Sequence, residues 1–113
     1  MKTKDLIGPA LDWAVAKCEG IPVDTPDWDN RFIDAYPYST DWATGGPIID
    51  REKFCAPTWD RLWQRWHCFN PKTAALDILG PTPLVAAMRC FVTSKLGDEV
   101  EIPKELARST ERR

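Results

Sequence analysis

The chain has 113 residues, a formal net charge of −2, and 28% charged residues. This length predicts one domain, residues 1–113, and the acidic balance argues against non-specific binding to nucleic acid, which requires a basic surface. No run of about 18 apolar residues is present, and no signal-type apolar run follows the first residues, so we expect no membrane span and a cytoplasmic protein.

The composition gives little support for a metal site or for a catalytic nucleophile. The four cysteines contain no C-x-x-C pair, and His67 is the only histidine. A zinc site needs about four ligands at recognisable spacing, so we expect no metal and no cofactor. In a reducing compartment the cysteines should be free thiols, and Cys18 and Cys90 lie in apolar helical patterns typical of core residues.

The first predicted element is a helix over Pro9–Glu19, closed by Gly20. Leu6, Ala10, Ala14 and Cys18 fall on one stripe at helical spacing. Residues 21–46 are punctuated by proline and glycine, and a short strand is possible at Arg31–Ala35. The rest of this stretch is predicted to be a long loop, ordered because it is rich in tryptophan and tyrosine.

The middle of the chain is harder to assign. Pro47–Phe54 predicts a short helix with proline at its start. Trp59–Phe69 fits both a helix and a strand, but a turn signal at Asn70–Thr73 leads to the apolar run Ala74–Leu79. A turn between two such runs favours a β-hairpin.

The clearest element follows Gly80. Thr82 is a suitable N-cap, Pro83 fits the first helical position, and Gly97 can end the helix in a left-handed conformation. Apolar residues occupy one helical face between them: Leu84, Ala87, Met88, Phe91 and Val92. Asp98–Ala107 is predicted to be an extension, and residues 108–113 a frayed tail.

These elements predict an α+β fold. An N-terminal helix and a long C-terminal helix pack on a small antiparallel sheet, and a long loop rich in tryptophan and proline joins them.

Three regions of the sequence resemble a known family: Gly8–Gly20; Tyr38–Ala43 followed by Gly45–Ile49 with Arg51 and Glu52; and Gly80–Cys90 with Lys95–Val100. In this order they are similar to the NinX-like family of small phage and prophage proteins, a family of unknown function. Residues 54–79 match only loosely. The resemblance implies a phage or prophage origin and action in the bacterial cytosol, and it implies no particular activity.

A candidate ligand site lies in the central segment. It offers a flat ring, an acceptor, free hydroxyls and a cation near an expected helix start, which together suit a flat, partly anionic ligand. We expect Trp63 or Trp66 to join it. The predicted site residues are Tyr38, Ser39, Thr40, Asp41, Trp42, Arg51, Trp63 and Trp66.

Structural explanations compete with this hypothesis. The aspartates beside tryptophans (Asp27, Asp29, Asp41 and Asp60) are more often caps of backbone N–H groups than ligand contacts. The starts at Thr44–Pro47 and Gly80–Pro83 are more often plain helix starts than anion sites. The six tryptophans can lie in the core or on a binding surface, and we favour the core for most of them.

The function favoured by the sequence is non-enzymatic binding. The partner is either a nucleotide-like ligand, such as a sequestered host defence signal, or a host protein. One alternative is a small enzyme that acts on a nucleotide-like substrate through Asp41 and Arg51. Another is an interaction protein that assembles with other phage factors, and a homo-oligomer stays open.

Overall fold

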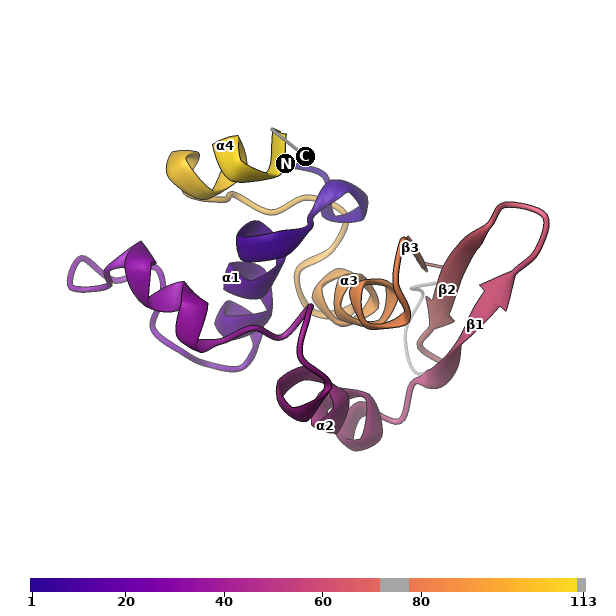
Figure 1. Cartoon of the computed structure of the whole chain (residues 1–113). Helices are drawn as coiled ribbons and strands as arrows, with labels where there is room; N and C mark the ends of the chain where they lie inside the picture. The colour runs from indigo at the N-terminus through magenta and orange to yellow at the C-terminus, as the bar shows by residue number, and fades with distance from the viewer. Residues whose placement is uncertain (72–77, 112–113) are drawn as a thin grey trace.

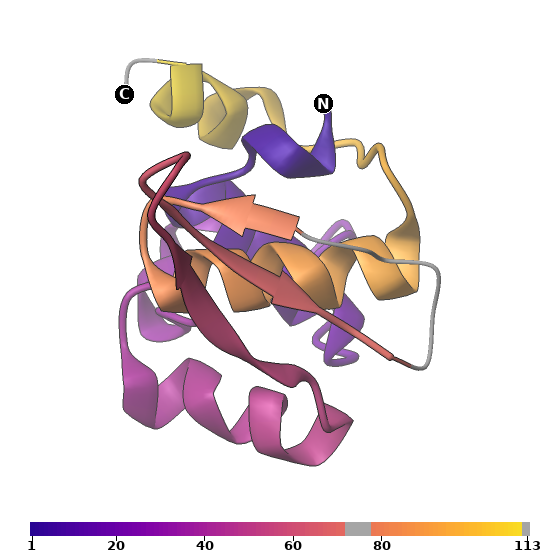
Figure 2. The same ribbon diagram turned by 90° about the vertical axis from the view of Figure 1, so that its right-hand side faces the viewer.

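The computed structural model describes residues 1–71 and 78–111, and helix α3 (Pro83–Leu96) runs through its centre (Figure 1). Helix α1 (Gly8–Cys18) lies on one side of α3 and a three-stranded antiparallel sheet on the other, while helix α2 (Trp42–Glu52) lies below α3 (Figures 1 and 2). The α+β class predicted from the sequence is therefore confirmed. No helix within the described ranges is long and apolar enough to cross a membrane.

Helix α1 matches its prediction to within one residue at each end. Pro9 lies in its first turn, where a missing N–H costs nothing. At the other end the N–H of Gly20 donates to the carbonyl of Lys17 at 3.1 Å, and the φ angle of 87° at Gly20 turns the chain away. The helix is buried over most of its length, so it forms one side of the core.

The strand predicted at Arg31–Ala35 is wrong, because this segment is the 3₁₀-helix η2 (Asn30–Ala35). The side chain of Asp29 accepts a hydrogen bond from the N–H of Arg31 at 2.9 Å and starts the helix. The N–H of Tyr36 then donates to the carbonyl of Ile33 at 2.9 Å. Local bonds of this kind satisfy the backbone without a partner strand.

Helix α2 begins five residues before the predicted start, and Pro47 lies inside it. Asp41 caps it, accepting from the N–H of Ala43 at 3.2 Å. Pro47 cannot donate to the carbonyl four residues earlier, which belongs to the exposed Ala43, so water can satisfy that carbonyl. The helix ends at Lys53, which adopts a left-handed conformation with φ 57°.

The sheet consists of β1 (Cys55–Asp60), β2 (Arg65–Phe69) and β3 (Ile78–Gly80), in that order. Trp59 lies opposite Trp66, so the segment that fitted both helix and strand contains the tip of a hairpin. Asp60 makes this tight turn, because its carboxylate accepts from the N–H groups of Leu62 at 2.9 Å and Trp63 at 3.1 Å.

The hairpin predicted across Asn70–Thr73 involves β2 and β3, which pair through Cys68 and Ile78. Most of the predicted turn and the start of its second strand fall on residues 72–77, outside the described residues.

Helix α3 begins and ends where the sequence predicts. Thr82 accepts from the N–H of Val85 at 3.1 Å, and the N–H of Gly97 donates to the carbonyl of Thr93 at 3.0 Å. The apolar face is wider than predicted, because residues on every side of the helix are buried: Leu84, Val85, Ala86, Ala87, Met88, Cys90, Phe91 and Val92. A helix that is apolar all round must be covered on all its faces.

The first residues of the chain, with the short 3₁₀-helix η1 (Thr3–Asp5), pair with the segment that follows α3. Lys2 and Glu99 form a β-bridge, and the hydroxyl of Thr3 donates to the carbonyl of Gly97 at 2.7 Å. Helix α4 (Lys104–Glu111) follows and packs on α1, as the upper part of Figure 1 shows. It extends through residues 108–111, into the stretch predicted to be a solvated tail; residues 112–113 lie outside the described part.

Phe91→Ala tests the central position of α3. The ring of Phe91 is 0% exposed and lies 6.3 Å from the ring of Phe54. Loss of buried area together with a residual cavity should lower the free energy of unfolding by ~3–5 kcal/mol, measured by urea denaturation. Phe91→Leu should lose less, and a loss below ~1 kcal/mol in Phe91→Ala would contradict this packing.

Candidate functional site

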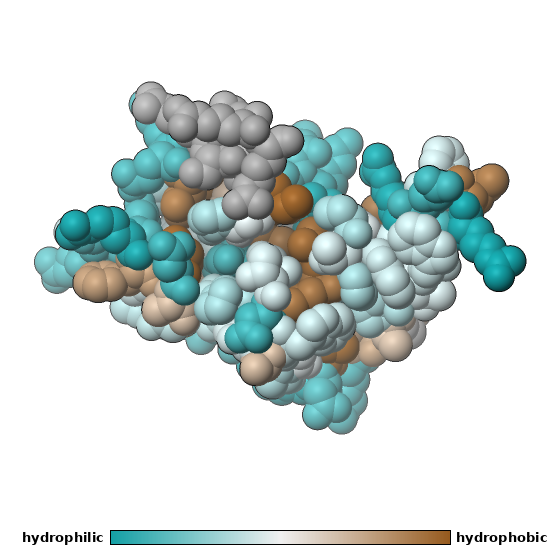
Figure 3. Space-filling view, viewed as in Figure 1, coloured by the Kyte–Doolittle hydropathy of each residue, from teal (hydrophilic) through white to brown (hydrophobic). Residues whose placement is uncertain are grey.

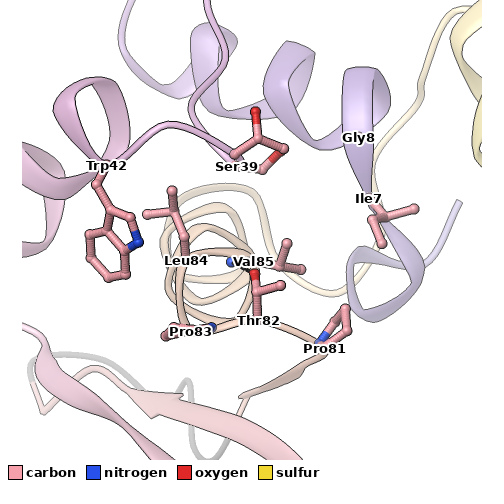
Figure 4. A pocket seen from close by; sticks show the side chains of 10 residues that line it. Ile7, Gly8, Ser39, Trp42, Pro81, Thr82, Pro83, Leu84 and Val85 are labelled. Carbon is pink, nitrogen blue, oxygen red and sulfur yellow. Dashed lines mark hydrogen bonds between the residues drawn. The ribbon is translucent and has the colours of Figure 1, made fainter.

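A pocket of about 380 Å³, which we call the Trp42 pocket, lies where the three helices α1, α2 and α3 begin (Figure 4). Segments from three parts of the chain line it, each of them at or just before a helix start: Ile7, Gly8, Ser39, Thr40, Trp42, Pro81, Thr82, Pro83, Leu84 and Val85. Figure 3 shows hydrophobic surface gathered at the centre of the face on which α3 begins, with hydrophilic surface towards both ends.

The walls of the pocket differ in character. Trp42 stands at one side with 53% of its surface exposed, and Ile7 stands at the other side across the start of α3 (Figure 4). Leu84 and Val85 are buried and belong to α3. The pocket therefore offers an aromatic face and an apolar floor.

The segment that carries Ser39 is held by buried hydrogen bonds. The N–H of Ser39 donates to the buried carboxylate of Asp12 on α1 at 2.8 Å. Beside it Tyr38 is buried and stacks on Tyr36, with 6.2 Å between ring centroids and 12° between the planes. The backbone of this segment is thus fixed against α1 before α2 begins.

Gly45 lets α2 lie close against that segment. A Cβ at Gly45 would stand 2.1 Å from the carbonyl oxygen of Tyr38, closer than any real contact. A Cβ at the neighbouring Gly46 would meet only the ring of Trp42, at 3.5 Å, an ordinary van der Waals distance. Gly45 therefore sets the distance between α2 and the buried segment, and with it the position of Trp42.

Ser39 has an unusual environment. It is 2% exposed, and its Oγ is buried with no hydrogen-bond partner among the described residues. A buried hydroxyl normally finds a partner, because leaving it unpaired costs about 1–3 kcal/mol. Ser39 is one of the residues that line the pocket, and its hydroxyl has no partner among the described residues.

The pocket wall contains no ionisable side chain among its 10 residues. Its electrostatic character comes from the starts of the helices, which carry a partial positive charge. Pro9 and Pro83 remove two of the N–H groups that could face a ligand, and Asp41 already caps α2. The pocket therefore suits a neutral polar edge better than a full charge.

The structure brings together part of the predicted site. Ser39, Thr40 and Trp42 line the pocket, whereas Tyr38 packs in the core behind it. Asp41 acts as the cap of α2 and also accepts from the hydroxyl of Thr44 at 2.7 Å. The structural explanation is confirmed for Asp29, Asp41 and Asp60, each of which accepts a hydrogen bond from a backbone N–H.

Arg51 lies in the last turn of α2 and not near its start, which corrects the expected position of this cation. Its guanidinium binds the carboxylate of Glu19 at 2.5 and 3.0 Å and that of Glu52 at 3.0 Å. Hydrogen bonds to these two carboxylates raise the pKa of Arg51 above its usual value. At 1.5 Å per residue the helix separates Asp41 and Arg51 by about 15 Å, too far for the two to act on one atom.

Trp63 and Trp66 lie on the hairpin, away from the Trp42 pocket. Trp66 packs edge to face with Trp59 at 5.5 Å between centroids. Trp63 is 68% exposed at the hairpin turn.

Conversely, Ile7 and Pro81–Val85 line the pocket without having been predicted as site residues. Their only signal in the sequence was the helix start at Gly80–Pro83.

Cys18, Cys68 and Cys90 form no disulfide bond within the described residues. Burial raises the pKa of Cys18 to about 12, so its thiolate is scarce at neutral pH and this residue is a poor nucleophile. Within the described ranges, no group of three or more potential ligands could hold a metal ion.

The fold and the pocket define a small α+β protein with a cleft at converging helix starts. A family model described as bacteriophage P22 NinX matches residues 2–95, and the chain therefore belongs to this family of phage proteins. A search of the curated proteins finds no match.

Two neighbouring glycines give a matched test of how α2 is placed. Gly45→Ala should lower the melting temperature by several degrees, because its Cβ would clash with the backbone of Tyr38. Gly46→Ala should raise stability by up to ~1 kcal/mol, because alanine favours a helix interior and meets no close atom. Thermal unfolding followed by circular dichroism measures both, and equal effects would argue against the close approach at Gly45.

Proposed function

We propose that this phage protein is a small non-enzymatic binding protein of the bacterial cytosol, and that the Trp42 pocket holds a small ligand with a flat, nucleobase-like ring. Sequestration of a nucleotide-like host defence signal is the concrete form of this proposal. The observation that carries it is the unpartnered hydroxyl of Ser39 in a pocket whose rim is an exposed tryptophan.

The pocket's size and chemistry support this proposal. A volume of about 380 Å³ falls in the usual range for small-molecule sites, which combine apolar walls with a few polar groups. The exposed ring of Trp42 offers a face on which a flat ring can stack, and Ser39, Thr40 and Thr82 supply hydroxyls for its polar edge. A wall without an acid or a base favours binding over proton transfer.

A second candidate function rests on the hairpin turn. Leu62 is 84% exposed and Trp63 is 68% exposed, and both lie next to each other at the end of the hairpin. Exposed apolar and aromatic side chains in one place favour contact with another protein. A host protein bound at the hairpin turn is therefore the alternative partner.

Trp42→Ala and Trp63→Ala separate the two candidates. The protein and both variants are purified from a bacterial lysate and analysed by native mass spectrometry. The ligand proposal expects a small molecule on the wild type that is lost from Trp42→Ala and kept by Trp63→Ala. Because Trp42 is half exposed, its loss should shift the melting temperature by only a few degrees.

Three other outcomes would argue against the ligand proposal. Loss of a co-purified protein from Trp63→Ala alone would favour the hairpin candidate. A small molecule retained equally by both variants would remove Trp42 from the site. Turnover of a nucleotide-like compound would favour the enzyme alternative.

Ser39→Ala gives a test with opposite signs for stability and binding. Removing a buried hydroxyl that has no partner should raise the free energy of unfolding of the ligand-free protein, by up to ~1–3 kcal/mol. The same change removes a polar contact of the proposed ligand and should weaken its retention. Urea denaturation and native mass spectrometry measure the two effects; lower stability in Ser39→Ala would show that its hydroxyl already has a partner.

A further inference from the structure

A second hollow, of about 460 Å³, lies between η1 and the hairpin turn. Figure 1 shows β3 between these two elements. Its lining is polar and includes three cations and one carboxylate: Lys4, Asp5, Trp59, Gln64, Arg65, Gly80, Pro81 and Arg89. We call it the Arg89 hollow.

Arg89 is a partly buried cation that has no carboxylate in contact. Its Nε donates to the carbonyl of Leu6 at 2.7 Å, and its Nη1 donates to the carbonyl of Leu79 at 2.9 Å. Both partners are neutral, and no ion pair of Arg89 occurs among the described residues. A guanidinium carries five N–H donors, so these two bonds leave donors for a further partner.

One carboxylate, that of Asp5, stands against three cations in the lining of the hollow. Burial lowers the pKa of Arg89, Asp5 raises it, and the nearby charge of Arg65 lowers it again. Lys4 adds another cation to the lining. A partly buried positive charge faced by further positive charges is costly unless an anion compensates it. This concentration of cations is found in a chain whose overall charge is −2.

We propose that the Arg89 hollow is an anion site that takes the phosphate group of a small phosphorylated ligand. The two fixed hydrogen bonds orient the guanidinium of Arg89, which suits the planar, two-pronged recognition of a phosphate. Arg65 and Lys4 are exposed at the rim and supply further donors.

Trp59 adds an aromatic wall beside these charges and is 45% exposed. A ring that is part of the ligand can stack there, whereas free phosphate gains nothing from it. A small ligand is favoured over a nucleic acid because the cations are confined to one hollow and the chain as a whole is acidic.

The proposal does not depend on the Trp42 pocket, and pyrophosphate tests it alone. Isothermal titration calorimetry at low salt should show that pyrophosphate binds the wild-type protein. Arg65→Ala and Lys4→Ala should each weaken this binding by about 3- to 10-fold, through loss of a charge-assisted contact. Both side chains are exposed, so neither change should alter the melting temperature appreciably.

Arg61→Ala and Lys104→Ala are the matched controls. Both residues are exposed cations outside the lining of the hollow, and their removal changes the net charge by the same amount. The proposal is overturned if the wild type does not bind pyrophosphate, or if the controls weaken binding as much as Arg65→Ala and Lys4→Ala.

A single-stranded DNA oligomer forms the other arm of the experiment. Binding of the oligomer without binding of pyrophosphate would assign the cations to a nucleic-acid surface and overturn the small-ligand proposal. Arg89→Ala is not used as the primary variant, because it also removes two hydrogen bonds that hold Leu6 and Leu79. Pyrophosphate binding is measured separately from the small molecule retained from the lysate. A failure of either proposal can therefore be recognised independently of the other.

Discussion

The burial of α3 on all its sides is the constraint on which the rest of the structure depends. No single layer can cover such a helix, so α1, α2 and the sheet each cover a different side of it. The small residues set how closely the sheet approaches: a Cβ at Gly80 would stand 2.6 Å from the backbone nitrogen of Ala86. Arg89, half-buried on this helix, then ties the carbonyls of Leu6 and Leu79 to it. The Trp42 pocket lies where α3 begins, at the end of this tightly packed arrangement.

The elements with local signals were predictable. Caps and stops act within a few residues, so Thr82 and Gly97 mark the ends of α3 in the sequence as in the structure. The hairpin turn was not predictable in this way, because it contains no glycine and depends on the carboxylate of Asp60. The segment before α2 was misjudged for a related reason: Asp41 is a strong cap, but Gly45, Gly46 and Pro47 after it are poor helix formers. Close packing of Gly45 against Tyr38 favours the helix despite this.

The candidate site shows the same division between local and distant information. Ser39, Thr40 and Trp42 are neighbours in sequence and in space, and the sequence placed them together. Arg51 is close in sequence but a helix of about 15 Å separates it from them, so a list of suitable residue types in one segment overstates what can meet at one site. The opposite wall, from Ile7 and from Pro81–Val85, comes from distant parts of the chain, and no spacing rule could have brought it in.

The two hollows adjoin, because Pro81 lines both of them. The Trp42 pocket contains no ionisable group and offers an aromatic face with hydroxyls, a lining that suits a neutral, flat group. The Arg89 hollow offers one half-buried and two exposed cations, a lining that suits an anion. A nucleotide combines a flat neutral ring with an anionic phosphate. The Trp42 pocket suits the first of these groups and the Arg89 hollow suits the second. The two proposals together therefore assign one ligand class to an unpartnered hydroxyl on one side of Pro81 and to a guanidinium with only carbonyl partners on the other.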